Sequence, residues 1–206
     1  MREVKALFWD VGGVILSNGW DREERSAAIK HFRLDAESFE ERHELVNTPF
    51  ETGRMSLGAY LEATVFYCPR TFTQEEFKSF LFAQSKENRG TRSVLDELTA
   101  AGRYLQVTLN NESAELNAYR IREFHLRRNF NAFFTSCYLG VRKPDAAIYR
   151  LALDIIQRTP EECIFIDDRQ LNVECARRLG IRAIHFQNPA QLAQDLMHEG
   201  VRGAAA

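Results

Sequence analysis

Short apolar strands alternate with helices over most of the sequence, and this alternation restricts the fold more than any other feature. The strands are predicted at residues 6–9, 104–107, 133–135, 163–166 and 183–186. The helices between them are predicted to stop at Gly102, to run over 113–124, to include Ile148 and Ile155, to end at Gly180 and to run over 189–198. This order is typical of an α/β fold with a doubly wound, mostly parallel sheet.

Residues 20–88 have a different character, with several helical signals and no strand pattern. Asp21 with Glu24, and Thr73 with Glu76, have the spacing of a capping box, and Ser56 is suited to begin a third helix. We therefore predict a small helical subdomain at residues 19–88, inserted into an α/β core domain made of residues 1–18 and 89–206. Several aromatic residues of this segment suit either a substrate pocket or the subdomain's own core: Trp20, Phe50, Tyr60, Phe66 and Tyr67.

Composition excludes several classes of protein. With 206 residues, 45% of them hydrophobic, the chain can bury one core and a small second subdomain. Its formal net charge of -2, from 27 basic and 29 acidic residues mixed along the chain, provides no basic stripe for a nucleic acid. The apolar stretch near the N-terminus is too short for a signal peptide or a membrane span.

The four cysteines are widely separated, and two lie in segments predicted as buried strands, so disulfides are not expected. We expect a cytoplasmic protein, monomeric or homodimeric, with no nucleic-acid partner and no membrane association.

Polar side chains follow the ends of the predicted strands, which is where an open parallel sheet binds its ligands. In chain order they are Asp10, Thr108, Asn110, Asn111, Lys143, Asp167 and Asp168. Because the carboxyl ends of parallel strands lie at one edge of the sheet, we expect these residues to surround a single phosphate-transfer site.

Asp10 and the pair Asp167-Asp168 bring carboxylates together from two different strands. Carboxylates that converge in this way repel each other unless a cation lies between them, and hard oxygen ligands favour Mg²⁺. The sequence therefore predicts a magnesium ion shared by these acids.

Lys143 supplies a second positive charge, which can stabilise both a nucleophilic carboxylate and a transferring phosphoryl group. The backbone amides of residues 11–13, which include Gly12 and Gly13, can bind the phosphoryl oxygens. Asp10 is then the expected nucleophile, and the expected partner is a small phosphorylated metabolite.

Three motifs in this order resemble the haloacid dehalogenase (HAD) superfamily: Phe-Trp-Asp-Val-Gly-Gly-Val at residues 8–14, Arg-Lys-Pro-Asp at 142–145 and Phe-Ile-Asp-Asp at 165–168. The resemblance spans almost the whole chain and is closest to the branch with a helical cap inserted after the first strand. It implies that Asp10 is the aspartyl-phosphate nucleophile and a metal ligand, and that Lys143 is the charge-stabilising lysine. It also implies that Asp167 and Asp168 are metal-binding acids, with the backbone carbonyl of Gly12 as a further ligand.

The chain departs from the family pattern at Gly12. The usual phosphatase motif of the superfamily has a second aspartate at this position, which protonates the leaving group and activates the hydrolytic water, although relatives with glycine there remain phosphatases on sugar phosphates. Loss of a general acid and base typically costs about 10² to 10⁴ in rate, and substrates with weakly basic leaving groups lose less. Anomeric sugar phosphates, acyl phosphates or aryl phosphates are therefore the favoured substrates.

A second departure concerns the strand that precedes Asn110. The hydroxyl residue expected at its end falls on Leu109, whereas Thr108 comes one residue early and side chains alternate along a strand. Either a bulge turns Thr108 toward the site, or the backbone amide of Asn110 binds the phosphate without a hydroxyl.

The preferred interpretation is a magnesium-dependent phosphatase with an aspartyl-phosphate intermediate. One alternative is a haloacid dehalogenase, which uses the same nucleophile on carbon without a metal. Another is a catalytically silent protein that binds a phosphorylated metabolite. Chloride release that a chelator does not affect would indicate the first alternative, and magnesium-dependent binding without turnover the second.

Overall fold

A five-stranded sheet lies at the centre of the computed structural model, which describes residues 2–203. The strands have the order β3-β2-β1-β4-β5, and every neighbouring pair is parallel. The strand bounds are β1 (Ala6–Trp9), β2 (Leu105–Asn110), β3 (Ala132–Thr135), β4 (Cys163–Asp167) and β5 (Arg182–His185). The α/β fold with a parallel sheet, predicted from the sequence, is confirmed.

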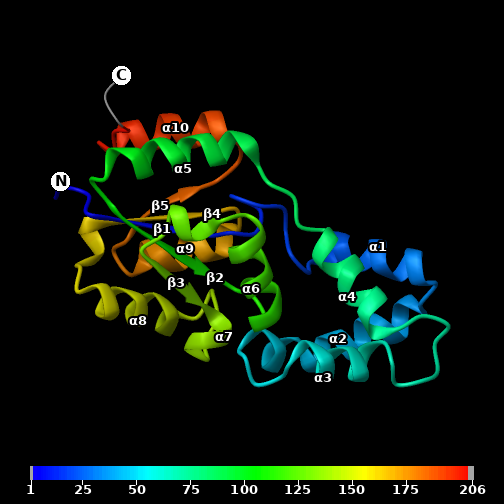
Figure 1. Ribbon diagram of the computed structural model, residues 1–206. Coiled ribbons are helices and arrows are strands. Elements are labelled where there is room, and N and C mark those ends of the chain that lie inside the picture. Colours follow the sequence, from blue (N-terminus) through cyan, green and yellow to red (C-terminus); the bar gives the residue numbers. More distant parts are fainter. Residues whose placement is uncertain (1, 204–206) are drawn as a thin grey trace.

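Helices cover both faces of the sheet (Figure 1). Leu7 and Trp9 point to one face, where they pack with α5 (Arg89–Ala101) and α10 (Pro189–His198). Ala6 and Phe8 point to the other face, where α8 (Ala146–Ile156) and α9 (Gln170–Arg178) cover them. Because side chains alternate along β1, its strand residues contribute to two separate cores, as a doubly wound fold requires.

The remaining elements of the sheet-containing part are short or lie at its end. Helix α6 (Ala114–Glu123) was expected from the sequence. The four-residue helix α7 (Ser136–Leu139) and two 3₁₀ turns, η1 (Leu126–Arg128) and η2 (Pro160–Glu162), were not expected, because such short elements leave no periodic pattern. Among the helices of residues 2–203, none is long and apolar enough to cross a bilayer.

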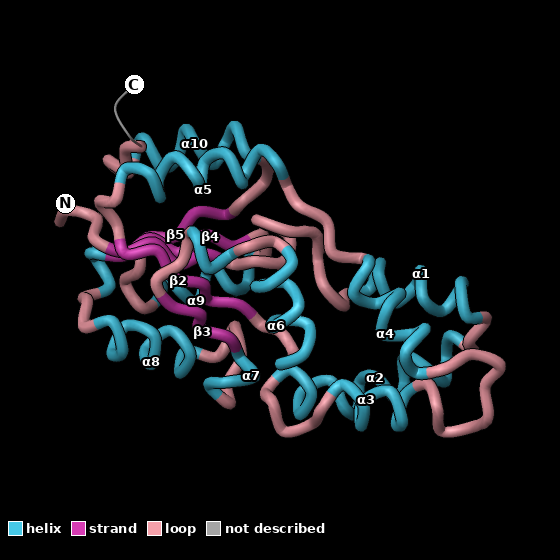
Figure 2. Tube along the Cα trace, viewed as in Figure 1, coloured by secondary structure: helices cyan, strands magenta, loops and turns pink. Residues whose placement is uncertain are grey.

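Four helices follow β1 and form a helical segment at one side of the sheet (Figure 2). They are α1 (Arg22–Phe32), α2 (Ala36–Glu51), α3 (Leu57–Thr64) and α4 (Gln74–Ala83). The capping boxes at Asp21 and Thr73 form, and Ser56 caps α3.

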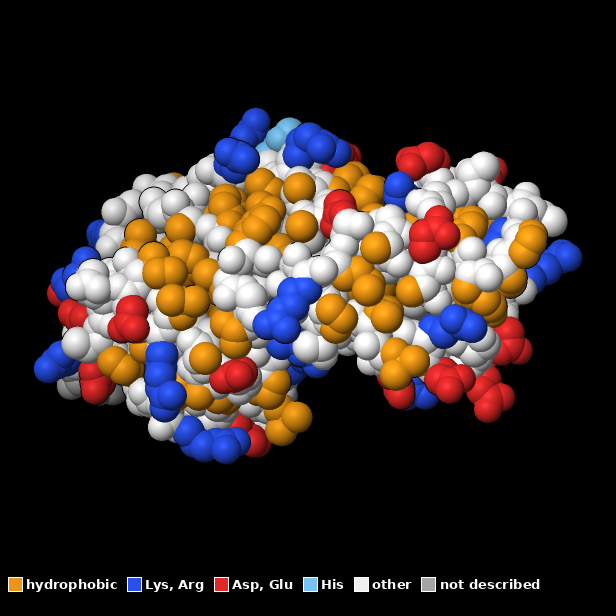
Figure 3. Space-filling view, turned by 90° about the horizontal axis from the view of Figure 1, so that it is seen from below, with side chains coloured by type: hydrophobic (Ala, Val, Ile, Leu, Met, Phe, Trp, Pro, Cys, Tyr) orange, Lys and Arg blue, Asp and Glu red, His pale blue; other side chains and the backbone are white. Residues whose placement is uncertain are grey.

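The helical segment has a hydrophobic cluster of its own, centred on buried Phe39, Tyr60 and Phe77, and Leu116 of α6 joins it. In space-filling form the segment and the sheet-containing part are two lobes with a notch between them (Figure 3). The boundaries 18/19 and 88/89 stay a prediction.

Strand register brings the ends of β1, β2 and β4 to one edge. Trp9 pairs with Thr108 on β2 and with Ile166 on β4, so Asp10 follows its strand at the level where β4 reaches Asp167. The Asp10 amide continues the ladder by donating to the Ile166 carbonyl at 2.9 Å. The polar residues after these strands are therefore next to one another.

Candidate active site

Three carboxylates converge at this edge of the sheet. Asp10, Asp167 and Asp168 each offer an oxygen, and these oxygens lie within 4.8 Å of one another. Asp10 and Asp167 are buried and Asp168 is partly buried. The structure thus brings together the acids that the sequence predicted to share a cation.

Lys143 lies between two of these acids. Its Nζ is 3.0 Å from Asp10 Oδ1 and 2.6 Å from Asp167 Oδ2, and its side chain is almost fully buried. The Asn111 side chain fixes the Lys143 backbone at both polar groups: Nδ2 donates to the Lys143 carbonyl at 2.9 Å, and Oδ1 accepts from the Lys143 amide at 2.8 Å. Asn111 is therefore a positioning residue for the buried lysine.

The partners of Asp167 and Asp168 differ. Asp167 accepts hydrogen bonds from Lys143, from the Arg169 amide at 2.8 Å and from Asn172 Nδ2 at 3.0 Å on both oxygens. Asp168 Oδ1 is buried and has no hydrogen-bond partner among the described residues. An unpaired buried carboxylate oxygen is costly, and a cation beside Asp10 and Asp168 would remove that cost.

Electrostatics at Asp10 also fit a cation. Burial raises the pKa of Asp10 well above its ordinary value, the charges of Asp167 and Asp168 add to this rise, and Lys143 opposes it. At Lys143, burial lowers the pKa, but the carboxylates of Asp10 and Asp167 outweigh it and keep the lysine protonated. One lysine does not neutralise three acids, so the donor set suits a divalent ion with oxygen ligands.

Asp10 lines a cavity of about 520 Å³, which suits a small metabolite. Of the residues predicted for the site, four line this cavity: Asp10, Gly12, Asn111 and Lys143. Gly13 lies against Asp168: a Cβ added to Gly13 would come within 2.2 Å of Asp168 Oδ2. The close approach of backbone to carboxylate explains the glycine.

Thr108 and Asn110 do not line this cavity. The Thr108 side chain is fully buried, and its hydroxyl has no hydrogen-bond partner in the described part of the chain. The Asn110 side chain is directed into the interior, where its Oδ1 accepts from Thr135 Oγ1 at 3.1 Å. Neither side chain is placed to bind a phosphate in the cavity, and a role for the Asn110 backbone amide stays a prediction.

The helical segment supplies the opposite wall of the cavity, with Trp20, His43, Asn47 and Phe50. Trp20 Nε1 donates to the Tyr60 hydroxyl at 2.8 Å, and that hydroxyl is 2.7 Å from His43 Nδ1. Burial lowers the pKa of His43 to about 4, so this wall presents a neutral imidazole. Trp20 and Phe50 also belong to the segment's own hydrophobic cluster, so their two expected roles coexist.

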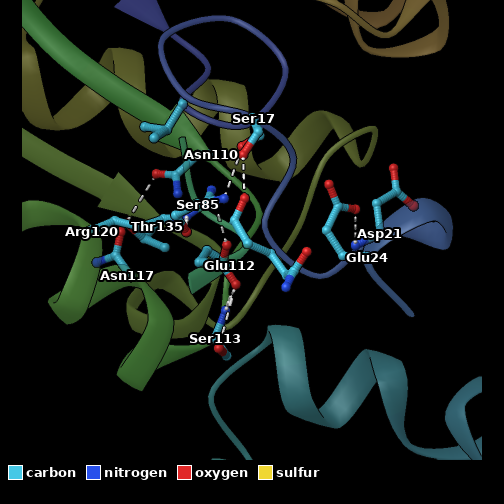
Figure 4. Close-up of polar contacts among 12 residues, drawn as sticks. Ser17, Asp21, Glu24, Ser85, Asn110, Glu112, Ser113, Asn117, Arg120 and Thr135 are labelled. Carbon is cyan, nitrogen blue, oxygen red and sulfur yellow. Dashed lines mark hydrogen bonds and ion pairs between the residues drawn. The ribbon is translucent and has the colours of Figure 1, made fainter. Parts of the chain in front are cut away.

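Sequence reasoning missed a buried ion pair in the same cavity. Glu112, two residues beyond β2, pairs with Arg120 of α6, with Arg120 Nη1 at 3.4 Å from Glu112 Oε2 (Figure 4). Arg120 is held in place by the Ser17 carbonyl at 2.9 Å and by the Ser85 hydroxyl at 3.1 Å. The position of Glu112 just after a strand end was a signal that could have identified it, whereas nothing in the pattern of α6 distinguishes Arg120.

A family model described as haloacid dehalogenase-like hydrolase matches residues 4–180. This chain therefore belongs to that hydrolase family, which confirms the resemblance stated above. Solved structures of the family share the fold: one HAD family enzyme of Bacteroides thetaiotaomicron, in complex with magnesium and inorganic phosphate, superposes with a TM-score of 0.76 at 19% identity, covering 90% of this chain and 95% of that one.

Curated relatives match shorter stretches. A flavin mononucleotide hydrolase of Arabidopsis thaliana is 43% identical over 33% of this chain and 28% of its own length. A phosphorylated carbohydrates phosphatase of Thermotoga maritima is 28% identical over 54% of this chain and 51% of its own. The chain spans well under two thirds of the length of the first curated relatives that it matches.

Proposed function

We propose that this chain is a Mg²⁺-dependent phosphatase that acts on a small phosphorylated metabolite through an aspartyl-phosphate intermediate on Asp10. The supporting observation is the convergence of Asp10, Asp167 and Asp168 within 4.8 Å, with Lys143 at 3.0 Å from Asp10 and with Asp10 and Lys143 lining a cavity. Phosphoryl transfer with a metal needs at least a nucleophilic carboxylate, a fixed positive charge and a further acid with an oxygen free to bind the metal. Asp10, Lys143 and Asp168 supply these groups in this proposal.

The residues have separate tasks in this proposal. Asp10, Asp168 and the Gly12 carbonyl would hold Mg²⁺, which when bound would neutralise charge on the phosphoryl oxygens. Asp10 attacks phosphorus with its other carboxylate oxygen. Lys143 favours the ionised form of Asp10 and stabilises charge on the transferring group, and Asp167 holds Lys143 in position.

The substrate class is inferred from the kind of leaving group that the site can release. Glycine at position 12 removes the usual acid and base from that position, which favours sugar phosphates and other esters with weakly basic leaving groups unless another side chain transfers the proton. The names of two relatives, a phosphorylated carbohydrates phosphatase and a flavin mononucleotide hydrolase, are compatible with a small phosphate ester. The helical segment would act as a cap, since its residues form the far wall of the cavity.

A panel of phosphorylated sugars, nucleotides and aryl phosphates, assayed for phosphate release with Mg²⁺ and with a chelator, tests this function. Wild-type protein is expected to release phosphate only with Mg²⁺, and Asp10→Asn is expected to be inactive while it keeps its fold. Equal hydrolysis by both proteins would exclude Asp10 as nucleophile. Chloride release from 2-haloacids in the presence of chelator would indicate a dehalogenase instead.

A further inference from the structure

We propose that Glu112 takes the place of the aspartate missing at Gly12, donating a proton to the leaving group and then accepting one from the hydrolytic water. This proposal rests on the proposed phosphatase function and assigns a proton-transfer residue to the same site. It is carried by the position of the Glu112 carboxylate relative to Gly12, Arg120 and the cavity.

Glu112 and a side chain built at position 12 would adjoin the same atom, Arg120 Nη1. Arg120 Nη1 lies 3.4 Å from Glu112 Oε2, and it would lie 3.6 Å from a Cβ built on Gly12. All three residues line the cavity that contains Asp10. The Glu112 carboxylate and a leaving-group oxygen above Gly12 would therefore adjoin the same guanidinium nitrogen, and the proposed proton transfer takes place between them, directly or through one water.

Neighbouring residues leave room for the Glu112 carboxyl group and fix its position. A Cβ on Gly19 would come within 2.4 Å of Glu112 Oε2, so a larger residue there would push the carboxylate away. The other oxygen, Oε1, accepts from the Ser113 amide at 2.9 Å, which fixes the side chain (Figure 4). The 3.4 Å separation of Oε2 from Arg120 is long for a charge-assisted hydrogen bond, so Oε2 is left able to carry a proton.

The acidity of Glu112 is suited to both proton transfers. Burial raises the pKa of Glu112 to about 7, although Arg120 on α6 and the Ser113 amide act in the opposite direction, and Glu51 on α2 adds to the rise. Burial and, to a smaller extent, the charge of Glu112 raise the pKa of the Cys137 thiol on α7 to about 12, so this thiol stays neutral. A group with a pKa near neutrality serves best as both acid and base.

The proposed steps balance. Asp10 forms a bond to phosphorus while the bond from phosphorus to the leaving oxygen breaks, and that oxygen takes the proton of Glu112 to leave as an alcohol. Water then attacks phosphorus, gives a proton to the Glu112 carboxylate, and the Asp10 oxygen leaves with its electron pair. Inorganic phosphate is released, and Asp10 and Glu112 return to their starting states.

Dependence on the leaving group tests this role. For Glu112→Gln, kcat/KM is expected to fall about 100-fold on alkyl phosphates and by no more than a few-fold on nitrophenyl phosphate, since a weakly basic leaving group needs no proton. Wild-type kcat/KM on alkyl phosphates should fall as pH rises above about 7, and Glu112→Gln should lose this limb. If Glu112 had only a structural role, Glu112→Gln would lower kcat/KM by the same factor on all substrates.

A second test of the Glu112 role restores an acid at position 12. The Gly12 backbone is not left-handed, and the nearest described atom to a Cβ there is 3.5 Å away, so the backbone at this position accepts a residue with a side chain, as in Gly12→Asp. In the Glu112→Gln background it should recover at least about 10-fold of kcat/KM on alkyl phosphates. Glu123→Gln, at the exposed end of α6, is the matched control and should behave as wild type.

The outcomes separate this proposal from the one on which it rests. If wild type is active, Asp10→Asn is inactive and Glu112→Gln keeps the wild-type leaving-group dependence and pH profile, the phosphatase function stands and the role of Glu112 is overturned. If wild type hydrolyses no phosphate ester, both proposals are overturned. Selective loss on alkyl phosphates with recovery by Gly12→Asp supports both.

Discussion

The Asp168 carboxylate lies directly against the backbone of Gly13, so close that a Cβ on Gly13 would come within 2.2 Å of Asp168 Oδ2. Gly13 has a φ of +75°, a left-handed conformation that glycine adopts without strain. The loop after β1 and the acid after β4 are therefore fitted to each other at the point where a metal ion is proposed.

Gly13→Ala is expected to displace Asp168 and weaken Mg²⁺ binding by about 10-fold or more, as measured by the Mg²⁺ dependence of phosphate release. It should also lower stability by about 1–2 kcal/mol through its positive φ. Gly140→Ala is the matched control, because Gly140 has a φ of +71° and no atom of the described residues lies within 4 Å of a Cβ there. Gly140→Ala should lose stability without a change in Mg²⁺ binding. Equal Mg²⁺ dependence of phosphate release in the two variants would contradict the steric argument.

Asn111→Ala should loosen Lys143, because two hydrogen bonds from one side chain hold the lysine's backbone. We expect a stability loss of about 1–3 kcal/mol by thermal unfolding and a fall in kcat of about 10-fold or more. Asn188→Ala, which removes the N-cap of α10 far from the cavity, should cost about 1 kcal/mol without changing kcat. An Asn111→Ala variant with unchanged kcat would show that Lys143 does not depend on this support.

Thr108→Val tests whether the Thr108 hydroxyl binds substrate. Because this hydroxyl is buried with no hydrogen-bond partner within residues 2–203, its replacement by a methyl group should be neutral or stabilise the fold by about 1 kcal/mol, with kcat and KM unchanged. Chemical denaturation and steady-state kinetics provide the two measurements. A large rise in KM would instead show that the strand rearranges to present Thr108 to the phosphate.

Glu112→Gln should change how stability depends on pH. Since the folded-state pKa of Glu112 is raised to about 7 from 4.5, the folded protein holds this proton after the unfolded chain has lost it. Wild-type stability therefore falls as pH rises from about 4.5 to 7, by an amount on the order of 3 kcal/mol from this group. The difference in unfolding free energy between wild type and Glu112→Gln should change across that window, and a constant difference would argue against a raised pKa.

Local sequence patterns predicted most of the elements. The strand Ala6–Trp9 and the helix Pro189–His198 were predicted with the bounds that the structure shows, because apolar spacing and capping residues act over a few neighbouring positions. The order of strands and helices was sufficient to predict a parallel sheet, and that sheet placed Asp10, Lys143, Asp167 and Asp168 at one edge.

Tertiary structure decided what surrounds these acids. The sequence could not show that Thr108 and Asn110 face the interior, since one residue of register exchanges the two faces of a strand. It also could not bring Glu112, Arg120 and Gly19 together, because they come from three different segments and only packing fixes their distances. The sequence by itself determined that Asp10 and its charged neighbours, which lie at or beyond strand ends, come together at one edge of the sheet. The cavity, the partners of each carboxylate and the acid proposed for the leaving group came only from the folded chain, because burial and long-range contact have no local pattern.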